Sequence, residues 1–452
     1  IRLSLVGSEM CIRDSCQLVL GDAPRGSAFA ALVLAVAGVA AAALYARLRA
    51  GTALPDPTAD AGARATALSL LALGASLMLA LAPKIHWESF NGDGVHAYEA
   101  TRLLLRQVLP FWPDDVTALD AFPGLTSMLF AFPGSWFLRL FGEIESAARV
   151  PFLLYLVGLH GGILAVATSM RPLGTPERWL LSLQLAVYAV VMAFSATYSP
   201  YAADLALPAT QDTLLVACFL GFVHAVIRRD GLFVLVFAAL TYTSLPSGLL
   251  LMVFFLAAWL GMERPAPWRA TAMGAGAVLA CMAVAALAPA GLDALGLPGP
   301  GHEYSSSNLR ERLATIQLED VRRVLFAVLP GGIAPALALL AWRRQPTAAR
   351  ALTGVSLLYF GFFYVQASVS LHHFVPAMLL PIAVLWSCPV PARLRPAFLA
   401  GVGALGLTAL LLSLPGHAVP YTAGRTIGTA IDDRFGPAAD DPSADYDGTV
   451  YN

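Results

Sequence analysis

The stretch "QDTLLVACFLGFVHAVIRRDGLFVLVFAALTYTSLPSGLLLMVFFLAAWL" (211–260) contains three apolar runs, separated only by an Arg-Arg-Asp turn and a Ser-Leu-Pro turn. A helix that crosses the hydrocarbon core of a bilayer needs about 20 mostly apolar residues, and arginines collect in loops between such helices. A helix that is apolar on all sides is buried or faces lipid. The stretch therefore predicts three consecutive membrane helices, at 212–227, 231–244 and 246–260.

Similar apolar runs recur along most of the 452 residues, of which 58% are hydrophobic and 13% are charged. This is more apolar sequence than one soluble core buries, so we predict an all-α polytopic membrane protein with about twelve transmembrane helices. The other candidate spans lie at 27–46, 66–83, 149–170, 179–197, 270–289, 324–342, 351–368, 374–388 and 397–414. The net charge of −1 excludes a strongly basic nucleic-acid-binding protein.

Arginines mark alternate loops between these candidate spans, and such loops face the cytoplasm in membrane proteins. They are Arg47, Arg49, Arg64, Arg171, Arg178, Arg228, Arg229, Arg264, Arg269, Arg343, Arg344, Arg350, Arg393 and Arg395. This orientation requires that "LTSMLFAFPGSWFLRLF" (125–141) does not cross the membrane. The segment is short, is interrupted by Pro133-Gly134 and carries Arg139, so we expect a helix that lies at the interface or re-enters. A large first outer loop (84–148) and a second outer loop (290–323) then face the exterior.

The remaining segments complete the expected domain organisation. Residues 1–15 include "LVGSEMCIRDS", which resembles the translated read-through of a sequencing adapter, so we expect an artefact there and a missing natural N-terminus. Residues 16–65 hold an extra N-terminal span and a cytoplasmic loop. Residues 66–414 form the transmembrane domain, and 415–452 form an acidic tail outside the cytoplasm.

The first outer loop begins with "HWESFNGDGVHAYEATRLLLRQ" (86–107), in which Asp93 stands between two glycines directly before a predicted helix. An aspartate at the mouth of a span can accept a proton from an acceptor hydroxyl, which is the work of a general base. Asn91 or Asp93 can equally cap the helix, as short polar residues commonly do. The candidate substrate-binding residues that follow at near-helical spacing are His96, Tyr98, Glu99 and Arg102.

This loop resembles the first outer loop of the GT-C class of polyprenyl-phosphate-sugar glycosyltransferases, in particular the protein O-mannosyltransferase and aminoarabinose-transferase branch. In that family an aspartate after the first core span precedes the pattern "x-x-x-Y-x-x-x-A". The similarity continues, in order, through "FPGLTSMLFAFPGSWFLRLFGEIESAARVP" (122–151), "ALPATQDTLLVACF" (206–219), "LTYTSLPSGLLLM" (240–252) and "HHFVPAMLLP" (372–381). The chain departs from the family in having Gly94 where the family has a second acid.

The resemblance implies a GT-C-like bundle whose first outer loop carries interfacial helices. It also implies an enzyme, a glycosyltransferase that moves a hexose or pentose from a polyprenyl-phosphate donor to a lipid, glycan or protein acceptor outside the cytoplasm. Asp93 is then the general base of an inverting displacement, and Asp212 opens the fourth core span. We expect no cofactor, no metal and no nucleic-acid partner, and a location in the bacterial inner membrane.

Other candidate site residues each have a second interpretation. Asp212 hydrogen-bonds the sugar, supports the general base or caps its own helix. Arg310 and Arg312 clamp the donor phosphate by bidentate hydrogen bonds or lie on a solvated amphipathic helix. His372 and His373 contact the phosphate or anchor the chain at the membrane interface.

Buried polar residues in the predicted spans are expected to have structural roles. His160 and His224 are predicted to hydrogen-bond local partners, and Cys218, Cys281 and Cys388 are predicted to pack in the core because they lack metal-ligand spacing. The alternative function is that of a polytopic transporter or flippase for a lipid-linked or small polar substrate, whose polar residues line a path through the membrane. The polar residues of interest instead lie in outer loops, which favours the transferase.

Overall fold

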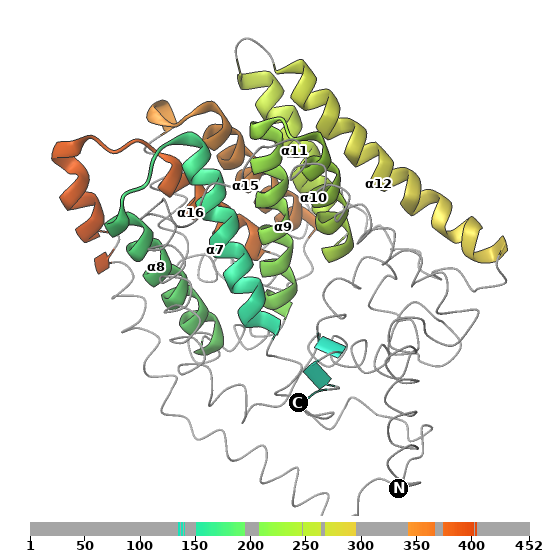
Figure 1. Cartoon of the computed structure of the whole chain (residues 1–452), viewed down its shortest axis with the longest axis horizontal. Coiled ribbons are helices and arrows are strands. Elements are labelled where there is room, and N and C mark those ends of the chain that lie inside the picture. Colours follow the sequence, from blue (N-terminus) through green and yellow to red (C-terminus); the bar gives the residue numbers. More distant parts are fainter. Residues whose placement is uncertain are drawn as a thin grey trace, which may run out of the picture.

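The computed structural model describes residues 134, 135, 137, 138, 140, 151–194, 208–245, 247–263, 267–294, 342–366, 374–401, 403 and 404. Within this part of the chain the backbone forms helices and the turns between them, and it contains no β-strand. Figure 1 shows these helices as one bundle. The prediction of an all-helical protein is therefore confirmed for the described residues.

The helices lie at the positions of candidate spans. They are α7 (Pro151–Met170), α8 (Thr175–Phe194), α9 (Pro208–Arg228), α10 (Gly231–Ser244), α11 (Gly248–Met262), α12 (Trp268–Ala294), α15 (Thr347–Gln366) and α16 (Val375–Ser387). Two single 3-10 turns are η5 (Trp342–Arg344) and η7 (Ala392–Leu394), and 395–401 are also helical. α10 has the predicted bounds, whereas α8 begins at Thr175 instead of residue 179.

α9 forms the centre of the bundle. It packs most extensively against α7 and α10 and also contacts α11, α12 and α16. Every residue from 211 to 223 is buried. Gly221 permits the close approach of α9 and α10, because a Cβ atom there would collide with the ring of Phe237. α15 packs against α11 and α16, and α12 lies along the edge of the bundle (Figure 1).

The turn between α9 and α10 is fixed by backbone hydrogen bonds and one side-chain cap. Arg229 has a φ of 57°, and its N–H donates to the Val226 carbonyl at 3.1 Å. The N–H of Asp230 donates to the Ala225 carbonyl at 3.0 Å, which completes a Schellman motif. The Asp230 carboxylate then accepts a hydrogen bond from the Phe233 N–H at 3.3 Å. The Arg-Arg-Asp sequence thus ends one helix and starts the next.

The turn between α10 and α11 brings two helix ends together. Leu245 is extended, and its N–H donates to the Thr241 carbonyl at 3.4 Å. A Cβ atom on Gly248 would lie 2.6 Å from the carbonyl oxygen of Thr241, so only glycine permits this close return of the chain.

The described helices are strongly apolar. The segment Gln211–Arg228 is both long and apolar enough to cross a membrane. Shorter apolar helical segments are Leu154–Met170, Gly231–Ser244, Gly248–Met262, Thr347–Phe363 and Val375–Ser387. Cys218, Cys281 and Cys388 are buried free thiols, which confirms their prediction as packing residues.

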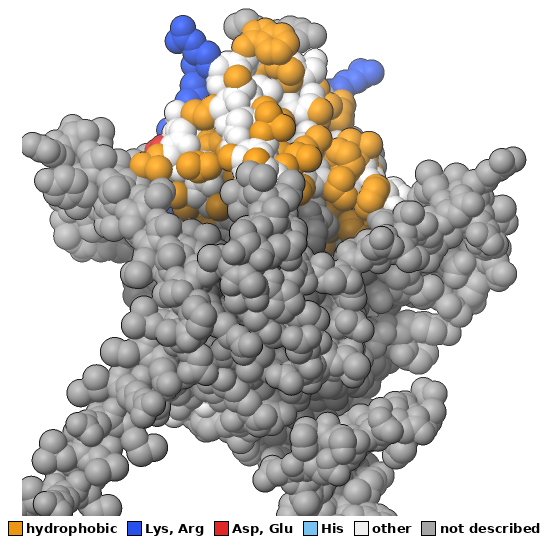
Figure 2. Space-filling model, turned by 90° about the vertical axis from the view of Figure 1, so that its right-hand side faces the viewer, with side chains coloured by type: hydrophobic (Ala, Val, Ile, Leu, Met, Phe, Trp, Pro, Cys, Tyr) orange, Lys and Arg blue, Asp and Glu red, His pale blue; other side chains and the backbone are white. Residues whose placement is uncertain are grey.

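Large apolar side chains are exposed along α8, α10, α11, α12 and α15, and Trp268 of α12 is 67% exposed. In Figure 2 such side chains cover much of the described side of the bundle, and Lys and Arg side chains stand at one end. The end of α7 and the start of α8 lie toward the same end of the bundle as the end of α11 and the start of α12 (Figure 1). Gly231, at the start of α10, lies beside Met273 near the start of α12, so the α9–α10 turn belongs to this end too.

Several predicted segments lie outside the described residues. These are 1–15, 16–65, the spans at 27–46 and 66–83, the second outer loop (290–323) apart from 290–294, the span at 324–342 apart from Trp342, and the tail at 415–452. In the first outer loop, residues 134, 135, 137, 138 and 140 are helical, within the segment expected to lie at the interface.

Candidate functional site

Asp212 is described in the structure and lies in the first part of α9. The helix begins at Pro208 and has no acidic residue in its first turn, so the alternative in which Asp212 caps its own helix is wrong. The side chain is buried, with 1% exposure. A buried ionisable group is unfavourable unless its neighbours compensate for lost hydration, and such groups in membrane helices commonly mark functional sites.

The residues on either side of Asp212 connect α9 to neighbouring helices. Gln211 Nε2 donates to the Ser244 carbonyl, at the end of α10, at 3.0 Å. Thr213 Oγ1 and the Tyr188 hydroxyl of α8 are hydrogen-bonded at 3.4 Å, with either group as donor. The start of α9 is therefore held by polar contacts on two sides.

A second tyrosine in the same part of the bundle comes from α15. Tyr359 is fully buried. Its hydroxyl donates to Ser247 Oγ, at the start of α11, at 3.1 Å. We call the set Tyr188, Gln211, Asp212, Thr213, Ser247 and Tyr359 the Asp212 cluster.

The Asp212 cluster lies at the end of the bundle away from the arginine-bearing turns. Asp212 is near the start of α9, whereas Arg228 is the last residue of that helix. Ser247 directly precedes α11, whose far end leads to the α11–α12 connection. A buried carboxylate in a region that contains hydroxyl groups can accept a proton or orient a polar ligand, because each hydroxyl both donates and accepts hydrogen bonds.

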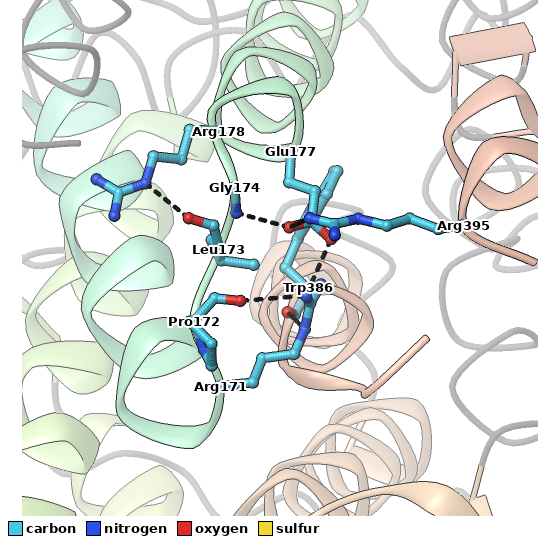
Figure 3. A network of polar contacts seen from close by, with 8 residues as sticks. All are labelled: Arg171, Pro172, Leu173, Gly174, Glu177, Arg178, Trp386 and Arg395. Atoms are coloured by element: carbon cyan, nitrogen blue, oxygen red, sulfur yellow. Dashed lines mark hydrogen bonds and ion pairs between the residues drawn. The ribbon is translucent and has the colours of Figure 1, made fainter. Parts of the chain in front are cut away.

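The opposite end of the bundle contains another buried acid, Glu177, at the start of α8 (Figure 3). Its Oε1 atom pairs with Arg171 Nη1 at 2.9 Å, and its Oε2 atom pairs with Arg395 Nη2 at 2.6 Å. Oε2 also accepts the Gly174 N–H at 2.8 Å. Arg171 Nε donates to the Trp386 carbonyl at 2.9 Å, so the α7–α8 turn is tied to the end of α16. We call these five residues the Glu177 network.

The charge state of Glu177 follows from these contacts. Burial alone raises the pKa of its carboxyl, but the Gly174 N–H and the guanidinium groups of Arg171 and Arg395 outweigh burial and hold the pKa below its ordinary value. Glu177 is thus ionised and fully paired. Gly174 leaves the space for Arg395, because a Cβ atom there would lie 2.8 Å from Arg395 Nη2. This arrangement joins distant segments and presents no reactive group.

The buried His160 and the half-buried His224 have local partners, as predicted. His160 Nε2 is hydrogen-bonded to Ser182 Oγ at 2.9 Å. His224 Nδ1 is hydrogen-bonded to Ser169 Oγ at 2.8 Å, and it lies 3.1 Å from the Ala165 carbonyl. Among the described residues, no group of three or more His, Cys, Asp or Glu side chains is placed to hold a metal ion.

The other predicted site residues lie outside the described residues. They are Asp93, His96, Tyr98, Glu99, Arg102, Arg310, Arg312, His372 and His373. The structure instead adds residues to Asp212 that the sequence did not single out, namely Tyr188, Ser247 and Tyr359. In sequence these residues are ordinary members of apolar helices or of a turn, and only their hydrogen bonds at the end of the bundle that holds Asp212 distinguish them.

Comparison of the chain with protein-family models, with curated proteins and with solved structures finds no match.

Proposed function

We propose that the protein is an integral membrane glycosyltransferase with a GT-C-like bundle of about twelve transmembrane helices. The exposed apolar side chains along five helices support a lipid-facing surface, since soluble monomers rarely expose apolar patches of this extent. The arginine-bearing turns at one end of the bundle support a cytoplasmic location for that end. The Asp212 cluster then faces the other side, in the bacterial inner membrane.

The proposed reaction is the transfer of a sugar from a polyprenyl phosphate to a lipid, glycan or protein acceptor. The Asp93 carboxylate takes the proton of the acceptor hydroxyl as its oxygen bonds to the anomeric carbon. The bond between the anomeric carbon and the phosphate oxygen breaks, the configuration inverts, and polyprenyl phosphate leaves. Arg310, Arg312, His372 and His373 are the proposed contacts of the donor phosphate.

The observation that carries the proposal is the buried Asp212 carboxylate, which lies at the end of the bundle opposite the arginine-bearing turns. Its 1% exposure favours a role in orienting neighbouring groups over open contact with solvent. If position 212 had only a structural role, an uncharged side chain would suffice there and would avoid the unfavourable burial of a carboxylate. Together with the resemblance of the first outer loop, this acid favours chemistry at that end.

The test is transfer of radiolabelled sugar from polyprenyl-phosphate-sugar by the purified full chain. Asp93→Asn keeps the turn, the possible helix cap and nearly the same volume, so the protein should fold while turnover falls about 10²-fold to 10⁴-fold. Glu99→Gln tests the other acid of this loop as the base. Near-normal turnover in Asp93→Asn with loss in Glu99→Gln would move the base role to Glu99.

The same preparations distinguish the alternative class. Movement of the lipid-linked sugar across proteoliposomes without cleavage of the sugar–phosphate bond would favour a flippase and contradict the transferase proposal.

A further inference from the structure

Tryptophan and arginine stand next to each other in the sequence where two helices and a 3-10 turn begin. The pairs are Arg178-Trp179 near the start of α8, Trp268-Arg269 at the start of α12 and Trp342-Arg343 in η5. Trp179 is 44% exposed and Trp268 is 67% exposed, so much of each indole is open. In membrane proteins tryptophan is enriched at the membrane–water interface, where its ring contacts lipid and its N–H contacts water.

All three pairs lie at the arginine-bearing end of the bundle. α8 and α12 begin there (Figure 1). η5 precedes α15, and a Cβ atom on Gly354, early in α15, would lie 3.9 Å from Met262 Cε at the end of α11. Farther along α15, Tyr359 donates to Ser247 Oγ, which precedes α11. The two helices are therefore antiparallel, and the start of α15 lies beside the end of α11.

The exposed faces of α8 and α12 change from tryptophan to leucine with distance from this end. Leu183, one turn beyond Trp179, is 55% exposed. Leu279, three turns beyond Trp268 on the same side of the helix, is 63% exposed. Each indole thus lies between an arginine and an aliphatic surface. A membrane interface has the same order, with charge outermost and aliphatic side chains toward the hydrocarbon core.

Exposed arginines supply positive charge at this end, and Figure 2 shows Lys and Arg side chains beside a hydrophobic surface. For four exposed arginines, the part of the chain that the structure describes contains no hydrogen bond or ion pair to the side chain. They are Arg228, Arg229, Arg269 and Arg343. Nearby acids do not neutralise them, because Glu177 is paired within its own network and Asp230 caps α10.

Arg229 occupies a backbone position that favours glycine. Its φ is 57° at the end of α9, and a residue with a Cβ atom is less stable than glycine in this left-handed region. Glycine would form the turn more readily, so the exposed arginine there points to a use for its charge. The turn lies beside the first turns of α12, since a Cβ atom on Gly231 would lie 2.9 Å from Met273 Sδ.

We propose that the arginine-bearing end of the bundle binds the headgroups of anionic phospholipids. The indoles of Trp179 and Trp268 lie where lipid chains meet headgroups, and the exposed guanidinium groups bind lipid phosphates by charge-assisted hydrogen bonds. A phospholipid fits this surface because positive charge and apolar area lie side by side, whereas a free phosphate would leave the indoles in water. The inference rests on the membrane location in the proposed function and is independent of the transfer reaction.

The first measurement compares how spin-labelled phosphatidylglycerol and phosphatidylcholine associate with the purified full chain in phosphatidylcholine vesicles. One arginine near an anionic membrane surface strengthens binding about fivefold, or about 1 kcal/mol. Because the zwitterionic lipid also offers a phosphate, we expect a preference of at least about twofold for phosphatidylglycerol. Replacing the four exposed arginines by glutamine should remove most of it. Replacing them by lysine, the matched control that retains charge, should keep most of it.

Arg229→Gly serves where the fourfold glutamine variant does not fold. It removes one charge and places at the turn the residue that the backbone favours, so thermal stability should stay the same or rise. The preference for phosphatidylglycerol should nevertheless fall. An unchanged preference in Arg229→Gly, or equal association of both lipids with the wild type, would overturn the proposal.

The second measurement places Trp268 in the bilayer by fluorescence. Lipids brominated near the headgroup should quench its emission more than lipids brominated near the chain terminus. Trp268→Phe should lose this quenched component. Trp259→Phe is the matched control and should keep it, because Trp259 is 6% exposed and stacks on Phe255 inside the bundle. Quenching that is the same in Trp268→Phe and the wild type would contradict the proposed position of this indole.

The lipid measurements and the sugar-transfer assay fail independently. A preference for phosphatidylglycerol in a protein that transfers no sugar would contradict the transferase proposal and support the lipid-binding surface. Sugar transfer by a protein without this preference would do the reverse.

Discussion

Glu177 and Asp212 are both buried acids, but their surroundings differ at the two ends of the bundle. Glu177 has 0% exposure and is paired with two arginines and a backbone N–H. Asp212 has 1% exposure, and its neighbours along α9, Gln211 and Thr213, hydrogen-bond the Ser244 carbonyl and the Tyr188 hydroxyl. The described partners of Glu177 are thus charged groups, whereas the polar groups described near Asp212 are neutral.

The difference separates a structural acid from a candidate functional one. A carboxylate between guanidinium groups stays ionised, and its position is fixed by charge-assisted hydrogen bonds. Neutral hydroxyl groups near a carboxylate allow it to change its proton or its hydrogen-bond partner, because hydroxyl groups rotate between donating and accepting. We therefore expect changes at Glu177 to act on folding and changes at Asp212 to act on chemistry.

The largest effect on stability is expected for Glu177→Gln. Removing this charge leaves Arg171, 13% exposed in its side chain, without its counter-charge, and breaking a buried ion pair from one side costs about 3–5 kcal/mol. Thermal unfolding of the purified full chain in one detergent measures this loss. Sugar transfer per folded molecule should stay close to that of the wild type.

A smaller effect is expected for Arg395→Gln, the matched change on the other side of the pair. The Arg395 side chain is 44% exposed, so solvent already screens its interaction with Glu177. The expected loss is about 1 kcal/mol. A destabilisation as large as that of Glu177→Gln would show that Arg395, and not Arg171, carries the network.

The smallest effect near neutral pH is expected for the pH dependence of stability, which appears only in acid. The folded pKa of Glu177 lies below its ordinary value of 4.5. The stabilisation from its ion pairs is therefore fully present above that value, and it is lost as the pH falls through the lowered folded pKa. Thermal midpoints of the wild type should fall in acid more steeply than those of Glu177→Gln. Parallel curves would contradict the assignment of this pH dependence to Glu177.

Hydropathy predicted the helices of the described residues because the apolar runs are long and polar or helix-breaking residues separate them. α10 has the predicted bounds because Asp230 caps its start and the chain becomes extended at Leu245. α8 begins earlier than predicted because Thr175, Pro176 and Glu177 are polar or helix-breaking in a hydropathy profile yet form its first turn. The sequence Gly-Thr-Pro-Glu was the available signal, since a Glu three residues after a helix cap can bond back to the cap N–H.

The partners of the two buried acids were not predictable from local sequence. Arg395 is 218 residues from Glu177, and only the packing of the end of α16 against the α7–α8 turn brings them together. Asp212 was identified as a candidate from its position, but Tyr359 resembled a core aromatic residue. The hydrogen bond from Tyr359 to Ser247 depends on how α11 and α15 are arranged in the bundle, which a periodicity of apolar residues does not specify.

The contrast between the two acids is tested most directly by Asp212→Asn, measured beside Glu177→Gln for both thermal stability and transfer of sugar from polyprenyl-phosphate-sugar. Asparagine keeps the volume of Asp212 and a side chain that forms hydrogen bonds, but it cannot take up a proton or carry charge. We expect Asp212→Asn to unfold near the wild-type temperature and to lose at least about tenfold in turnover, the effect of about 1.4 kcal/mol on the barrier. Wild-type turnover in Asp212→Asn, together with a loss of stability like that of Glu177→Gln, would make both acids structural and contradict the account.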